Sequence, residues 1–115
     1  MAQEVARREE SAVAVPDALA RYQRQAAGAF STNTERAIRS DTRVFADWCA
    51  AQGYASLPAE PATIAAFVDD QAAQRAPATR RRYVSSIAHL HRAADVGDPT
   101  KSETVRLALK RMARS

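Results

Sequence analysis

The sequence predicts an all-α fold, a small bundle of about five helices, on three observations. Alanine, which has the highest helix propensity, supplies 27 of the 115 residues. Runs of β-branched residues are scarce and aromatic residues make up only 6% of the chain, so the core depends on a few large side chains. The third observation is the spacing of the 3 glycines and 5 prolines, which fall where helices would end and begin.

Residues 1–15 are polar and have no clear apolar period, so we expect a flexible N-terminal tail. A helical domain is expected to cover residues 16–115. Its first helix is predicted over residues 16–27, because Pro16 suits a first turn and Gly28 suits a helix end. The apolar side of this helix carries Leu19, Tyr22 and Ala26.

The second helix is predicted over residues 32–52. Thr32 lies three residues before Glu35, which is a capping-box pattern, and Gly53 follows the expected end. The apolar stripe of this helix consists of Ile38, Phe45, Trp48 and Cys49.

Prolines mark the start of the next two helices. The third is predicted over residues 61–74 and begins at Pro61, and the fourth over residues 77–95 begins at Pro77. The inward side chains are Ile64, Phe67 and Val68 on the third helix and Val84, Ile87, Leu90 and Ala94 on the fourth.

The fifth helix follows the segment "DPTKSE", in which Thr100 and Glu103 form a second capping-box pattern. Its apolar face carries Val105, Leu109 and Met112. Because the connections between all these elements are short, neighbouring helices are expected to pack as a bundle.

Charge is distributed unevenly along the chain. The chain has 17 Lys and Arg against 13 Asp and Glu, a net charge of +4. Residues 53–74 contain three acids and no base, whereas residues 75–94 contain five arginines and no acid. A one-sided basic segment suits a polyanion such as nucleic acid, and the alternative is a basic face that serves solubility only.

The basic segment includes Arg80, Arg81 and Arg82 in the first turns of the fourth helix, where the helix dipole disfavours cations. Helical geometry places Arg81, Arg82, Ser85, His89 and Arg92 on the face opposite the apolar stripe, with Thr79 and Ser86 beside Arg82. Arginines mixed with small hydroxyls suit phosphate contacts, and Arg82 could also reach a guanine edge. The second helix opens similarly, with Ser31, Asn33, Thr34 and Arg36.

Several other chemistries find little support in the sequence. His89 and His91 are two residues apart and point to different sides of a helix, so we expect no metal site, a surface His89 and a partly packed His91. Cys49 is expected to be a buried apolar residue and Tyr83 a packing residue and not a nucleophile. There is no glycine-rich phosphate loop, no signal peptide and no membrane-spanning run, and we expect neither a cofactor nor a small-molecule ligand.

Several short motifs run along the chain: "FS-x-x-T" at 30–34, "A-x-WC" at 46–49, "LPAEP" at 57–61, "T-x-x-x-x-V-S-S-I" at 79–87 and "LHR" at 90–92. Through them the chain, from Phe30 to about Pro99, resembles the SAM-like core-binding domain of tyrosine recombinases, the phage-integrase superfamily, and within it the Cre-like integrases. The order and spacing of the motifs carry the resemblance.

This resemblance implies a helical domain that binds duplex DNA and precedes a separate catalytic domain, the two forming a clamp around the duplex. In the family the second and fourth helices lie across the major groove. The DNA contacts implied here are Thr34, Arg36 and Ala37 on the second helix, and Thr79, Arg82 and Ser86 on the fourth, with Arg75 and Arg81 as phosphate neighbours.

The resemblance also implies partners and a location. The first and last helices are expected to contact other recombinase protomers in a synaptic tetramer, and the chain is expected to bind one half-site of an inverted repeat. The family's catalytic tyrosine lies in the other domain, and Tyr22, Tyr54 and Tyr83 do not occupy its place, so the chain is expected to bind DNA without cutting it. A cytoplasmic, nucleoid-associated protein of a bacterium or phage fits these expectations.

Two residues depart from the pattern of the family or of the core. Arg80 stands where the family has an apolar residue, and Asp41 falls on the apolar stripe of the second helix. We expect these two side chains to pair where the helices cross. The alternatives to a recombinase domain are a helical protein-interaction or oligomerisation module and a stand-alone DNA-binding regulator.

Overall fold

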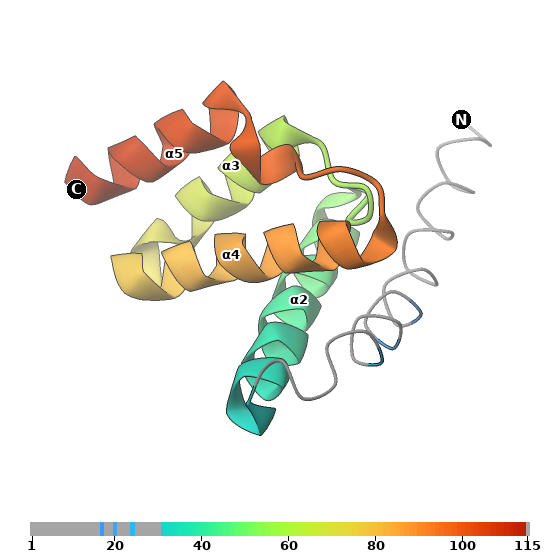
Figure 1. The fold of residues 1–115 in the computed structure, drawn as a ribbon. Helices are drawn as coiled ribbons and strands as arrows, with labels where there is room; N and C mark the ends of the chain where they lie inside the picture. Colours follow the sequence, from blue (N-terminus) through green and yellow to red (C-terminus); the bar gives the residue numbers. More distant parts are fainter. Residues whose placement is uncertain (1–16, 18–19, 21–23, 25–30, 115) are drawn as a thin grey trace.

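The computed structural model describes residues 17, 20, 24 and 31–114, and this part of the chain is helical without strands (Figure 1). Its α-helices and short 3-10 helices are α2 (Thr32–Gln52), α3 (Pro61–Asp70), η1 (Gln71–Ala73), α4 (Pro77–Ala94), η2 (Pro99–Lys101) and α5 (Glu103–Arg114). The predicted all-α fold is confirmed, with four α-helices in this range. None of the described helices is long and apolar enough to cross a membrane.

The predicted first helix and tail fall on residues that the structure describes only in part. Asp17, Ala20 and Arg24 are helical. The remainder of residues 16–27, and all of the expected tail at 1–15, lie outside the described residues.

The four helices pack as two pairs, and the members of each pair are not neighbours in the sequence. Helix α4 crosses α2, and α5 runs beside α3 (Figure 1). The α2–α4 pair carries the polar residues considered below, whereas the α3–α5 pair closes the other side of the core. This arrangement places the basic start of α4 on the same unit as α2.

Helix ends follow the glycine and proline positions closely. Gly53 takes the left-handed conformation, with φ 83°, as the C-cap of α2, and Pro61 and Pro77 each begin a helix. Helix α4 ends at Ala94, and its C-cap is Asp95, with φ 60°, although a glycine follows two residues later. Helix α3 is shorter than predicted, because its last turn tightens into η1.

Both predicted capping boxes are wrong in their residues. The N-cap of α2 is Ser31, whose Oγ accepts a hydrogen bond from the backbone N–H of Thr34 at 3.1 Å. At the start of α5 the side chain that accepts is Ser102, from Val105 N–H at 3.3 Å, and Thr100 belongs to η2. In each place two hydroxyl residues lie near the helix start, and the one with extended backbone geometry becomes the cap.

The core is centred on aromatic rings from three helices. Phe67 of α3 lies 5.1 Å from Phe45 and 5.3 Å from Trp48 of α2, measured between ring centroids. It also lies 5.7 Å from Tyr83 of α4. Helix α5 adds Val105, Ala108 and Met112, which are buried. The predicted inward residues of α3 are all buried, whereas Trp48, Ala94 and Leu109 are only partly so.

His91 is fully buried, so the prediction of a partly packed side chain is wrong. Its Nδ1 donates to the carbonyl of Ile87 at 2.8 Å, and its Nε2 accepts from the backbone N–H of Ala59 at 2.8 Å. These two bonds require the neutral ring, and burial lowers the pKa of His91. The side chain thus fastens the connection between α2 and α3 to α4.

Candidate nucleic-acid interface

The start of α4 is rich in arginine and lacks a side-chain cap. Ala76 occupies the N-cap position without a side-chain hydrogen bond, and no acid lies in the first turn. Arg75 and Arg81 are exposed there. Unpaired backbone N–H groups and nearby guanidinium groups together favour an anion at this helix end.

The start of α2 presents polar side chains to solvent. Ser31, Asn33, Thr34 and Arg36 are exposed, and Ala37 is partly buried. The hydroxyl groups of Ser31 and Thr34 lie 2.9 Å apart and hydrogen-bond to each other. This end of α2 therefore offers an arginine, an amide and two hydroxyls to solvent.

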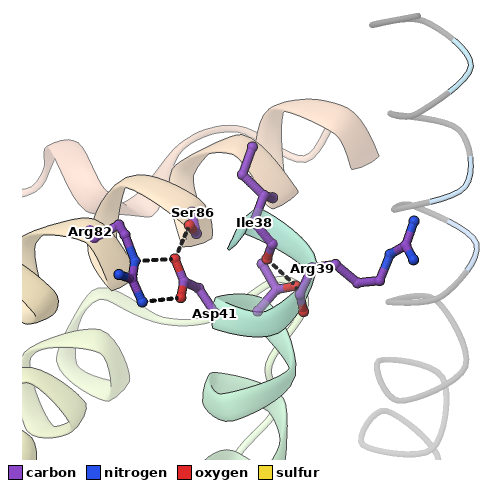
Figure 2. Close-up of polar contacts among 6 residues, drawn as sticks. Ile38, Arg39, Asp41, Arg82 and Ser86 are labelled. Carbon is purple, nitrogen blue, oxygen red and sulfur yellow. Dashed lines mark hydrogen bonds and ion pairs between the residues drawn. The ribbon is translucent and has the colours of Figure 1, made fainter. Parts of the chain in front are cut away.

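The two helices meet at a buried carboxylate (Figure 2). Asp41 of α2 has only 1% of its side chain exposed. Its Oδ2 accepts hydrogen bonds from Arg82 Nε at 3.0 Å and from Ser86 Oγ at 2.7 Å, and its Oδ1 accepts from Arg82 Nη2 at 2.9 Å. Arg82 and Ser86 lie one turn apart on α4, so both reach the same carboxylate.

The expected pair of Asp41 with Arg80 is therefore wrong, and Arg82 takes that place. Arg80 and Arg82 are two residues apart and point about 160° away from each other around the helix. Only one of them can face α2. Asp41 holds Arg82 by hydrogen bonds that raise the pKa of Arg82 above its ordinary value.

Ser86, which the sequence places beside Arg82, is buried. Its hydroxyl is used by Asp41. Thr79, one turn before Arg82 on the same side of α4, is partly buried. The structure thus brings Arg82 and Ser86 together with Asp41, and α2 carries Thr34 and Ala37 in the turns that precede Asp41.

Arg80 is buried, with 4% of the residue exposed, which fits its place at a position where the family has an apolar residue. Its Nε is buried and has no hydrogen-bond partner in the part of the chain that the structure describes. A buried N–H donor without a hydrogen-bond partner opposes folding, because its lost hydration is not replaced.

Replacing Arg80 with methionine should therefore raise the free energy of unfolding by about 1–2 kcal/mol. Methionine keeps the apolar part of the side chain in the core and removes the unsatisfied Nε donor. Urea unfolding followed by circular dichroism measures the change. The exposed neighbour Arg81→Met is the matched control, with an expected change within about 0.5 kcal/mol. A less stable Arg80→Met would show that the guanidinium contributes to folding.

Other reactive side chains have structural surroundings. Burial raises the pKa of the Cys49 thiol to about 12, which leaves it protonated at neutral pH. Tyr83 is 5% exposed and packs against Phe67. His89 is partly buried, and its Nδ1 lies 3.1 Å from Arg92 Nη2. The described residues contain no group of three or more His, Cys, Asp or Glu that could hold a metal ion.

Comparison with known proteins finds similarity to a recombinase. No family model matches the chain. The chain is 35% identical over 85 residues to a protein named as an integrase/recombinase XerD homolog, from Selenomonas ruminantium. The alignment covers 71% of this chain and 25% of that protein, so the chain spans about a quarter of the length of the relative it matches. This similarity supports a relationship between the chain and the tyrosine recombinases.

Proposed function

We propose that the chain binds duplex DNA as the core-binding domain of a site-specific tyrosine recombinase. The observation that carries the proposal is the start of α4, where Arg75, Arg81 and the outer part of Arg82 are exposed and no acid lies in the first turn. A duplex backbone would offset the repulsion between these cations and the positive end of the helix. The recombinase similarity supports DNA as the polyanion.

The proposed contact surface consists of the starts of α2 and α4. Arg75 and Arg81 would bind phosphates, while Ser31, Asn33, Thr34 and Arg36 would approach the same duplex from α2. Arg82 is the candidate for a base contact, because a guanidinium can donate two hydrogen bonds to a guanine edge. In this proposal Ala37, Thr79 and Ser86 lie beside these contacts and shape the surface.

The chain is proposed to bind DNA and to leave the cutting step to a separate catalytic domain. The buried setting of Tyr83 supports this division, because a nucleophilic tyrosine must reach a phosphate. Contacts with other recombinase protomers, through α5 and the segment before α2, belong to the same proposal.

The proposal predicts a strongly salt-dependent affinity for duplex DNA. The logarithm of the association constant should fall linearly with the logarithm of salt concentration, by about 0.9 for each phosphate neutralised. Arg81→Gln should make this slope shallower by about one phosphate contact. Fluorescence anisotropy of a labelled duplex between about 50 and 200 mM salt measures it.

A matched control is Arg106→Gln on α5, which removes the same charge from the other helix pair. Arg106 is exposed and pairs with Glu103. Its replacement should leave the salt slope unchanged. An affinity that does not depend on salt, or equal effects of the two variants, would contradict the proposed surface.

A further inference from the structure

The guanidinium of Arg82 has an inner edge that is fixed and an outer edge that is open. A guanidinium carries five N–H donors, and Asp41 accepts from two of them, on Nε and Nη2. The side chain of Arg82 is nevertheless 56% exposed, whereas that of Asp41 is 1% exposed. Both donors of Nη1 and the second donor of Nη2 are not bonded to Asp41 and belong to the outer edge.

The inner edge is held from two helices. Asp41 comes from α2, and Ser86, one turn after Arg82 on α4, donates to the same carboxylate oxygen at 2.7 Å (Figure 2). Arg39 of α2 points away from this cluster, so it does not compete for the carboxylate (Figure 2). The direction of the guanidinium plane is therefore set before any ligand arrives.

Such fixing matters for binding because a free arginine side chain loses rotamer entropy when it is ordered. Arg82 is ordered by Asp41 in the unbound chain, so that loss does not weaken the bound state. The pair is also close to neutral overall. The contribution of Arg82 to DNA binding then depends more on the direction of its N–H donors than on net charge. For its exposed neighbour Arg81, the charge itself is the main contribution.

We infer that Asp41 is a positioning residue for nucleic-acid recognition, which aims the outer edge of Arg82 at the duplex. The inference rests on the proposed function. It has a consequence opposite to that of simple electrostatics. Removal of a negative charge beside a DNA-binding surface should strengthen binding, whereas loss of a positioning residue weakens binding to a preferred sequence.

The test first selects duplexes from a random-sequence pool with the wild-type chain. Dissociation constants are then measured for a selected duplex and for the unselected pool. Asp41→Asn should reduce the ratio of the two affinities about tenfold, through weaker binding to the selected duplex. Arg82→Gln should cause a similar loss, and Asp41→Asn should have no additional effect in the Arg82→Gln chain, because Asp41 acts through Arg82.

Asp47→Asn is the matched control, since Asp47 is an exposed acid on the same helix. It removes the same charge and should preserve the ratio. If Asp41→Asn prevents folding, as judged by circular dichroism, Ser86→Ala provides the readout. That variant keeps both charges, removes one of the three bonds to Asp41, and should cause a smaller loss of the same sign.

The possible outcomes distinguish a failure of the proposed function from a failure of the inference about Asp41. A wild-type chain that retains no duplex contradicts the proposed function and this inference with it. A wild-type chain that selects a sequence, together with an unchanged or tighter selected complex for Asp41→Asn, overturns the inference only. Tighter binding would show that Asp41 withholds Arg82 from DNA. If Asp41→Asn does not fold, an unchanged ratio for Ser86→Ala overturns it equally.

Discussion

Replacing Phe67 with alanine should lower the free energy of unfolding by about 3–5 kcal/mol. Phe67 is fully buried, and its ring contacts the rings of Phe45 and Trp48 on α2 and Tyr83 on α4. The truncation removes a large apolar side chain and leaves a cavity between three helices that cannot collapse independently. Small domains have about 5–15 kcal/mol in total, so a large part of the stability should be lost. Urea unfolding followed by circular dichroism at 222 nm provides the measurement.

Tyr54→Ala is the matched aromatic control. Tyr54 is 46% exposed, and its ring lies 5.9 Å from that of Trp48. Its replacement should cost about 1 kcal/mol or less. Equal losses for the two variants would mean that Phe67 is not the centre of the core.

The second large effect is a loss of stability on acidification caused by His91. Burial lowers the pKa of this ring in the folded chain, while the unfolded chain titrates near the ordinary value of about 6.5. The bond to the Ile87 carbonyl and the charge of Asp98 oppose this shift without reversing it. Between the two pKa values the unfolded chain binds one more proton than the folded chain, so stability falls as the pH falls.

Because of His91, the free energy of unfolding should fall by up to about 1.4 kcal/mol for each pH unit below about 6.5. The fall should stop below the pKa that His91 has in the folded chain. Urea unfolding at a series of pH values from 7 to 5 measures it, above the range in which most carboxylates titrate. His91→Gln removes the titrating ring and keeps an acceptor for the Ala59 N–H. It should be less stable than the wild type at pH 7 but lose less on acidification. Since the pKa of His89 is also lowered, part of the slope should remain. Parallel pH profiles of the two chains would contradict the assignment to His91.

The helices could be predicted because their signals are local. Pro61 and Pro77 begin helices, Gly53 ends one, and the apolar spacing between them is helical. The caps were misplaced because neighbouring hydroxyl residues are chemically equivalent and only the backbone conformation selects Ser31 and Ser102. His91 could not be predicted as fully buried, because its decisive partner is a backbone N–H 32 residues away, which has no side-chain signature.

The candidate site shows the same limit. An acid on an apolar stripe signalled that Asp41 needs a cation, and a run of three arginines offered one. Consecutive residues differ by 100° around a helix, so the choice between Arg80 and Arg82 depends on how α4 is rotated against α2. Ser86 could have decided between the two arginines. It shares a helix face with Arg82 and not with Arg80, and a hydroxyl beside an arginine suits a shared carboxylate partner. The role of these residues toward DNA stays a prediction.

The order of helix pairing has a consequence for cooperativity. Helices α2 and α4 form one pair and α3 and α5 form the other. In the sequence, α3 therefore lies between the members of the first pair, and α4 lies between the members of the second. Any contiguous segment that contains both helices of one pair also contains one helix of the other pair. Many helical bundles fold fast because helices adjacent in the sequence pack together as local hairpins. In this domain the main packed pairs are not adjacent in the sequence, so local hairpins are not its folding units. The chain should unfold in a single step, and the relative placement of the two helix starts that we propose to face DNA depends on the integrity of the whole bundle.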